Sequence, residues 1–197
     1  EFRRVLFRSP DGQKNNKYTL EPVAAKLAEL LGNETEVTFF DDCIGMGAQQ
    51  MVKDLKPGKI LMLENLRFYA EEEANENSFA KELAKLCDVY INDAFGVSHR
   101  KHASVYALPE NVREKAFGFL MEKEVSELGK LLGMKHGDGF VAILGGAKVS
   151  DKIGIIRPLL DGADKLIIGG AMAYAFLAAK GVALGKSLVE KDKIDVA

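Results

Sequence analysis

Short apolar runs alternate along this chain with segments whose apolar residues recur at helical spacing. Runs of four or five apolar residues are typical of strands buried on both faces, and strand–helix alternation produces βαβ units with a parallel sheet. The sequence therefore predicts an α/β fold. The predicted strands lie at 37–40, 59–63, 88–91, 140–144 and 165–168, and the predicted helices at 20–31, 48–55, 77–86, 119–132 and 172–180.

A polar, glycine-bearing stretch at 135–139 follows the longest helical segment and precedes a new strand, as at a domain boundary. We expect a first domain over 10–118, an inter-domain helix over 119–135 and a second domain over 136–197. Roughly 60 residues follow the boundary, too few to bury an ordinary α/β core, so the second domain is expected to be incomplete.

The charge balance excludes several classes of protein. The chain has 27 Lys plus Arg against 29 Asp plus Glu, so it lacks the basic field of a nucleic-acid-binding protein. Its longest uncharged stretch in the C-terminal third, 166–179, is too short for a membrane span. Cys43 and Cys87 lie far apart without further ligands at metal spacing. We expect a cytoplasmic protein without a metal site, a nucleic-acid partner or a membrane contact.

Basic residues follow two of the predicted strands. In open parallel sheets, ligands bind beyond the carboxyl ends of the strands. Arg67 follows the second strand, and the loop after the third carries His99, Arg100 and His102. Guanidinium groups match phosphate and carboxylate, so two basic strand ends in one sheet predict an anion site. The alternative is that both arginines are solvated or paired with acidic neighbours. The acidic run 71–73 is interpreted as a solvated loop.

A glycine pair ending at Gly146 follows the fourth strand and leads into Lys148 and Lys152. Ser150 could cap the next helix, and helix N-termini attract phosphate. If that helix starts by Val149, both ammonium groups point to the same side. This turn predicts a phosphate site, with a tight turn bearing surface lysines as the alternative.

Gly169 and Gly170 follow the last strand, among small uncharged residues. They suit a flat ring such as adenine or, slightly favoured, close strand-to-helix packing. Pro158 lies inside a helical pattern and is expected to kink that helix.

Three strings together resemble the phosphoglycerate kinase family: LENLRF at 63–68, NDAFG at 92–96 followed by His99-Arg100 and His102-Ala103-Ser104, and GGAKVSDKI at 145–153. The resemblance runs from about Pro10 to the end. It implies reversible phosphoryl transfer from 1,3-bisphosphoglycerate to magnesium ADP, giving 3-phosphoglycerate and ATP in glycolysis. A non-catalytic α/β anion- or nucleotide-binding module is the alternative from another class.

The resemblance also implies a fold and a set of roles. The fold is two Rossmann-like parallel-sheet domains joined by a long helix, in a monomer, with Mg²⁺ carried by ADP or ATP. The substrate's phosphate is held by Arg67 and Arg100, beside His99. The phosphoryl group in transfer is steadied by Lys148, and the nucleotide is bound by Lys152, Lys148, Gly146, Gly169 and Gly170.

The chain departs from the family at its start. The family has His-Leu-Gly-Arg before the Pro-Asp-Gly that here is 10–12, whereas this chain has Leu6-Phe7-Arg8-Ser9. Residues 1–9 are therefore expected to be a non-native leader. The family's first strand and its later glycine-rich loop have no counterpart in these residues, so both domains are expected to be incomplete and this chain alone to be inactive.

Overall fold

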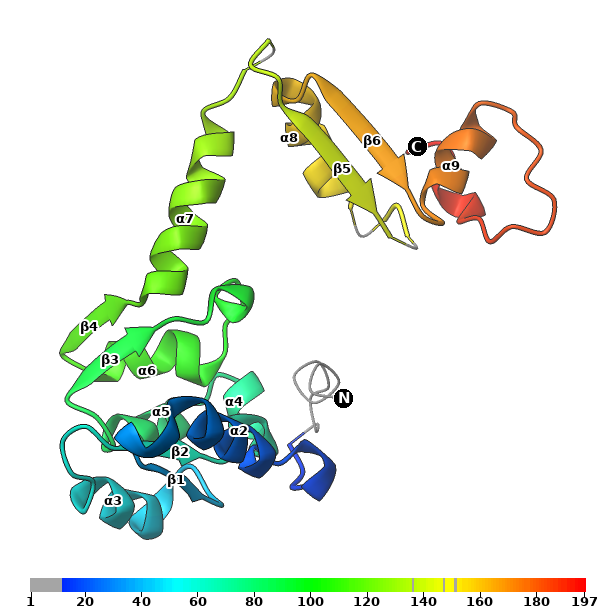
Figure 1. The fold of residues 1–197 in the computed structure, drawn as a ribbon. Coiled ribbons are helices and arrows are strands. Elements are labelled where there is room, and N and C mark those ends of the chain that lie inside the picture. The colour runs from blue at the N-terminus through cyan, green and yellow to red at the C-terminus, as the bar shows by residue number, and fades with distance from the viewer. Residues whose placement is uncertain (1–11, 136, 147, 151) are drawn as a thin grey trace. The chain divides into compact units, whose positions relative to one another are not determined.

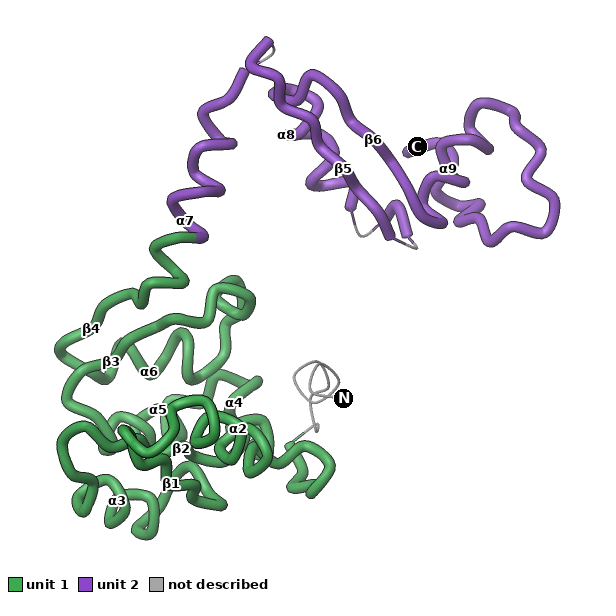
Figure 2. The backbone as a smooth tube through the Cα atoms, viewed as in Figure 1, with its two compact units in different colours: residues 1–123 green, residues 124–197 purple. Residues whose placement is uncertain are grey.

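The computed structural model describes residues 12–135, 137–146, 148–150 and 152–197 (Figure 1). Residues 1–9, expected to be a leader, lie outside the described residues. The chain divides into two compact units, unit 1 over 1–123 and unit 2 over 124–197 (Figure 2). The division falls inside the longest helix, α7 (Phe119–Leu132).

The described part of unit 1 contains four strands and five short helices besides the start of α7. Its strands are β1 (Val37–Phe40), β2 (Ile60–Leu63), β3 (Val89–Asn92) and β4 (Glu114–Phe117). Its helices are α2 (Glu21–Leu31), α3 (Gly45–Lys53), α4 (Ala70–Glu73), α5 (Asn77–Ala84) and α6 (Leu108–Asn111). Four 3₁₀ turns and a π-helix connect them: η1 (Asn16–Tyr18), η2 (Gly32–Glu34), η3 (Leu66–Phe68), η4 (Phe95–Val97) and the π-helix η5 (Ala103–Ala107).

Unit 2 continues from α7 with β5 (Val141–Gly145), α8 (Ile153–Gly162), β6 (Lys165–Gly169), α9 (Ala173–Ala179) and the 3₁₀ turn η6 (Lys191–Lys193). α8 continues through Pro158, which therefore does not end the helix. None of the helices in the described ranges is long and apolar enough to cross a membrane.

The strands pair in parallel, as predicted, in three two-stranded sheets: β1 with β2, β3 with β4, and β5 with β6. This arrangement of helices and parallel strands confirms the α/β fold class. β4 was not predicted, because Glu114 and Lys115 interrupt the apolar pattern by which the other strands were recognised.

The expectation that the strands are buried on both faces is wrong. Ile143 in β5 is 74% exposed although its neighbour Ala142 is buried, and Ile91 in β3 is exposed while Tyr90 packs on the core. Each of these strands packs its helix-facing side chains inward and turns the alternate ones outward.

Each unit has its own apolar core. In unit 1, α5 and the segment from η5 to α6 pack together, with Cys43 beside them; the buried core residues are Cys43, Phe79, Ala80, Leu83, Ala103, Ala107, Leu108 and Val112. In unit 2, α8 and α9 pack against β5 and β6 around Val149, Ile156, Met172 and Ala175. These cores hold the strand ends that carry the candidate site residues.

Candidate functional site

Arg67 lies in η3, immediately beyond the end of β2. The Asn65 side chain holds this turn, because its Oδ1 accepts a hydrogen bond from Arg67 N at 3.1 Å and its Nδ2 donates one to Tyr18 O at 3.1 Å. Arg67 O in turn accepts a hydrogen bond from Gly12 N at 3.2 Å. The backbone at Arg67 is therefore tied to the chain segment before α2.

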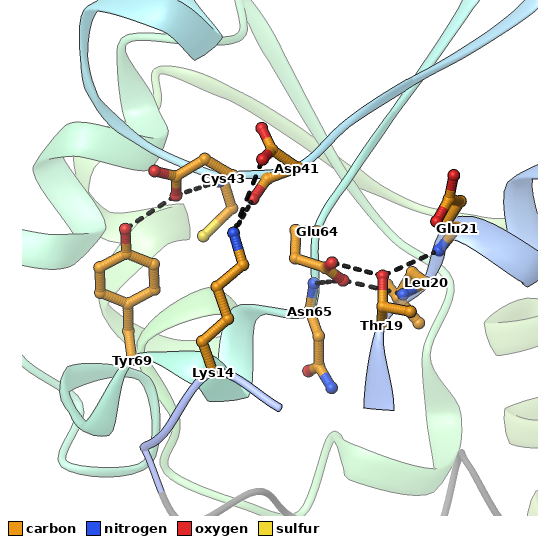
Figure 3. A network of polar contacts seen from close by, with 10 residues as sticks. Lys14, Thr19, Leu20, Glu21, Asp41, Cys43, Glu64, Asn65 and Tyr69 are labelled. Carbon is orange, nitrogen blue, oxygen red and sulfur yellow. Dashed lines mark hydrogen bonds and ion pairs between the residues drawn. The ribbon is translucent and has the colours of Figure 1, made fainter. Parts of the chain in front are cut away.

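Glu64, one residue beyond β2, is the buried centre of this polar network (Figure 3). Its side chain accepts hydrogen bonds from Thr19 Oγ1 at 2.6 Å, Leu20 N at 2.8 Å and Asn65 N at 2.7 Å. Only 4% of Glu64 is exposed. A buried carboxylate is retained when several donors satisfy it, and here those donors lock η3 against the start of α2.

The Arg67 side chain is 22% exposed, and its Nε lies 3.7 Å from Oε1 of Glu73 in α4. Pairing with an acidic neighbour was one of the two alternatives left open by the sequence, and the structure places Glu73 at that position. Among the described residues this long contact uses only Nε, so the other guanidinium donors are available for an anion.

His99 and Arg100 lie exposed in the loop between η4 and η5. The Ser98 hydroxyl donates to Ala94 O at 2.9 Å, and Arg100 N donates to Val97 O at 2.9 Å. Within the described part of the chain, the Arg100 guanidinium has no hydrogen bond or ion pair. The loop backbone is thus held in place while the charged group remains free to bind a ligand.

The prediction that the two arginines follow strands of one sheet is wrong. Arg67 follows β2, which pairs with β1, and Arg100 follows β3, which pairs with β4. Both strands belong to unit 1, and α4 contacts η3, which carries Arg67, and η5, which follows the Arg100 loop. A helix in the acidic run, and not a shared sheet edge, connects them.

The acidic run 71–73 forms most of α4 and is not the solvated loop that was expected. Glu72 is 3% exposed and accepts hydrogen bonds from Ser104 N at 2.9 Å and Ser104 Oγ at 2.5 Å. Sequence reasoning missed this contact because Ser104 is 32 residues away and no local pattern marks the pair.

In unit 2, Lys148 is exposed and Lys152 is partly buried at the N-cap of α8. α8 begins at Ile153, so the helix does not start by Val149, which was the condition for both ammonium groups to point to the same side. Ser150 does not cap α8 either. Its hydroxyl donates to Glu190 Oε1 at 3.0 Å instead.

Glu190 holds the lysine-bearing turn, a role that was missed from the sequence. Its Oε2 accepts a hydrogen bond from Val149 N at 2.5 Å, and this contact spans 41 residues of sequence. The Val149 side chain is fully buried, which anchors the turn from its other side. Lys148 therefore extends from a turn that is fixed both by a carboxylate and by the core.

The two glycine pairs lie side by side at the ends of β5 and β6, where Gly145 is opposite Gly169. Gly170 has a φ of +68°, and a Cβ atom there would lie 2.8 Å from Gly146 O. Met172 N also donates to Gly146 O at 2.9 Å. The close packing that the sequence favoured is present at Gly170, since any side chain would collide with the Gly146 backbone.

A small cavity of about 90 Å³ lies beside the Glu64 network and is lined mostly by polar residues. Burial, followed by the negative charges of Asp42, Glu72 and Glu64, raises the pKa of Cys43 to about 12. Burial and the hydrogen bond from its hydroxyl to Asp42 also raise the pKa of Tyr69. Both groups stay protonated at neutral pH. The lining residues are Lys14, Asp41, Asp42, Cys43, Glu64, Asn65, Phe68 and Tyr69.

Among the residues that the structure describes, no three or more His, Cys, Asp or Glu side chains are grouped to hold a metal ion. Each unit carries its own basic side chains on hydrogen-bonded turns. These are Arg67, His99 and Arg100 in unit 1, and Lys148 and Lys152 in unit 2. Such groups bind and neutralise anions such as phosphates.

Comparisons with known proteins agree on one family. The sequence model described as "Phosphoglycerate kinase" matches residues 6–197. The chain is 55% identical over 188 residues to a phosphoglycerate kinase of Anaeromyxobacter sp. (strain Fw109-5), covering 95% of this chain and 46% of that protein. It is 50% identical over 198 residues to one from Moorella thermoacetica, covering 98% of this chain and 49% of the relative.

A solved structure indicates the same family. The phosphoglycerate kinase of Coxiella burnetii matches with a TM-score of 0.74 at 35% sequence identity, covering 96% of this chain and 46% of that one. The chain thus spans about half the length of the relatives that it matches. The family match covers nearly every residue, so the chain belongs to the phosphoglycerate kinase family.

Proposed function

We propose that this chain supplies phosphoglycerate-binding and nucleotide-binding residues of a phosphoglycerate kinase. The reaction is reversible transfer of a phosphoryl group from 1,3-bisphosphoglycerate to magnesium ADP, giving 3-phosphoglycerate and ATP. The observation that carries the proposal is the Arg100 guanidinium, which has no partner among the described residues and extends from a hydrogen-bonded loop beyond a strand end, in a chain of this family. Residues 10–118 form the substrate domain, 119–135 the inter-domain helix and 136–197 the start of the nucleotide domain in this proposal.

In this proposal Arg67 and Arg100, with His99 beside them, hold the phosphate of the substrate that is not transferred. Guanidinium donors match phosphate oxygens in pairs, and their charge does not depend on pH in the ordinary range. The fixed backbones of η3 and of the loop before η5 support this role, because positioning is the main contribution a protein makes to phosphoryl transfer.

Lys148 and Lys152 act on the nucleotide side. Lys148 neutralises the charge on the phosphoryl group as it is transferred, and Lys152 binds the nucleotide phosphates. Gly146, Gly169 and Gly170 keep side chains away from the end of β5 and β6, so that a nucleotide approaches the backbone there. Mg²⁺ arrives bound to ADP or ATP as part of the substrate.

Replacing Arg100 or Arg67 with alanine is expected to weaken 3-phosphoglycerate binding roughly tenfold or more, because each removes charge-assisted hydrogen bonds to a phosphate. Isothermal titration calorimetry of the 197-residue chain measures this directly. Arg113→Ala is the matched control, since Arg113 is an exposed arginine of unit 1 that lies directly before the start of β4. Equal affinities in wild type, Arg67→Ala and Arg100→Ala would contradict the assignment of the arginines.

On the nucleotide side, Lys152→Ala and Lys148→Ala are each expected to weaken ADP binding roughly tenfold when ADP is titrated with Mg²⁺ present. Lys186→Ala, an exposed lysine of the same unit, should leave the affinity unchanged. The lysine assignment is wrong if the control loses as much affinity as Lys148→Ala and Lys152→Ala.

A further inference from the structure

The short helix α4 contacts η3, which carries Arg67, and η5, which begins three residues after Arg100. Glu73, its last residue, lies 3.7 Å from Arg67 Nε. Glu72, the residue before it, contacts η5, where it accepts hydrogen bonds from the backbone N and the hydroxyl of Ser104. One helical turn therefore connects the η3 turn with the start of η5.

On its η5 side, the Arg100 loop is anchored by Ala103, which is fully buried in the core, and by Ser104. Ser104 makes the polar contacts of this side, because its N and Oγ donate to Glu72 and its carbonyl accepts a hydrogen bond from Tyr90 OH at 2.9 Å. Only three residues separate Arg100 from Ser104. A shift of Ser104 is therefore transmitted to the Arg100 backbone.

Glu72 is suited to hold Ser104 in a fixed position. It is 3% exposed, so water does not compete for its oxygens, and the structure gives both oxygens to Ser104. The η5 segment is a π-helix, a conformation frequent at functional sites. Asn75, at a φ of +56°, adds a second contact to this segment, since its Oδ1 accepts a hydrogen bond from Ala107 N at 3.3 Å.

We propose that Glu72 is a positioning residue, which through Ser104 sets Arg100 relative to Arg67 so that both guanidinium groups address one phosphate. The inference rests on the proposed function of the two arginines. Glu72 itself does not touch the substrate, since its carboxylate is buried and would repel a phosphate. Its effect on binding is expected to pass through Arg100.

The test compares three substitutions in calorimetric titrations with 3-phosphoglycerate. Glu72→Met keeps the length of the side chain but removes both acceptors, and it is expected to weaken binding roughly fivefold. Glu72→Gln keeps an oxygen for Ser104 N and an amide that donates to the hydroxyl, so it should restore most of the affinity. Glu71→Met is the matched control, because Glu71 is an exposed glutamate on the same helix.

A double-mutant cycle separates positioning from a general structural effect. If Glu72 acts through Arg100, Glu72→Met should cost little further affinity in the Arg100→Ala background. Additive losses would overturn the inference, and so would equal losses in Glu71→Met and Glu72→Met. Should Glu72→Met fail to fold, Ser104→Ala and its rescue by Ser104→Thr replace it in the same cycle.

Amide hydrogen exchange distinguishes failure of this inference from failure of the proposed function. Glu72→Met is expected to accelerate exchange of the Ser104 amide, which donates to Glu72. Unchanged exchange would overturn the inference while leaving the arginine assignment intact. Faster exchange together with unaltered binding in Arg67→Ala and Arg100→Ala would overturn the proposed function, and the positioning role with it.

Discussion

Replacing Glu64 with leucine is expected to destabilise unit 1 by about 3 kcal/mol, because it leaves three partly buried donors without their acceptor. Three donors lose their partner: Thr19 Oγ1, Leu20 N and Asn65 N. At 4% exposure, Glu64 leaves little room for water to replace the carboxylate. The loss also frees Asn65, and with it the turn that carries Arg67.

Urea unfolding followed by far-UV circular dichroism measures this loss, since the chain has no tryptophan to serve as a fluorescent probe. Glu110→Leu is the control, because Glu110 is an exposed glutamate of unit 1. Glu64→Gln keeps one acceptor oxygen and should lie between wild type and Glu64→Leu. A loss below about 1 kcal/mol in Glu64→Leu, within the range of ordinary surface substitutions, would contradict the role assigned to the buried carboxylate.

The second large effect concerns Cys43, which is expected to react with iodoacetamide about 1,000-fold more slowly than an ordinary thiol at pH 8. The thiolate is the reactive form, and a pKa raised from 9.0 to about 12 lowers its fraction by roughly that factor. Because the shift is upward, the rate should keep rising about tenfold per pH unit above pH 9, where an ordinary thiol levels off. Burial of the sulfur slows the reaction further.

Single-cysteine variants allow the alkylation rate of each thiol to be measured separately. Cys87→Ala leaves Cys43 as the remaining thiol, and Cys43→Ala leaves the exposed Cys87. Mass spectrometry of the alkylated protein over pH 7 to 9.5 gives both rates, and addition of urea should bring them together as Cys43 becomes exposed. Rapid labelling of Cys43 in the folded protein would show that its surroundings differ from those described.

Local patterns predicted the elements that depend on local physics. α7 runs from Phe119 to Leu132 as predicted, because its apolar residues recur at the helical period and Gly133 follows it. β1 coincides with its predicted residues for a similar reason, since it is a short apolar run between polar residues. Two short elements without a recurring apolar pattern were missed: β4 begins Glu114-Lys115, and α4 is three-quarters glutamate.

The candidate basic residues were found because the alternation of predicted strands and helices shows where each parallel strand ends, and these residues directly follow those ends. The carboxylates that hold the turns bearing these residues were not found. Glu72 and Ser104 are 32 residues apart, Glu64 and Thr19 are 45 apart, and Glu190 and Ser150 are 40 apart. A single glutamate looks the same in the sequence whether it is solvated or buried, and only its distant donors distinguish the two.

The sequence by itself determined the α/β class, the family resemblance and the basic residues that follow the strands, because these depend on residue type, period and order along the chain. The tertiary structure alone decided which carboxylates are buried, that β2 and β3 lie in separate sheets, and that Gly170 meets the Gly146 backbone. Burial and hydrogen-bond pairing arise from contacts between segments far apart in the chain, and local periodicity contains no information about which segments meet.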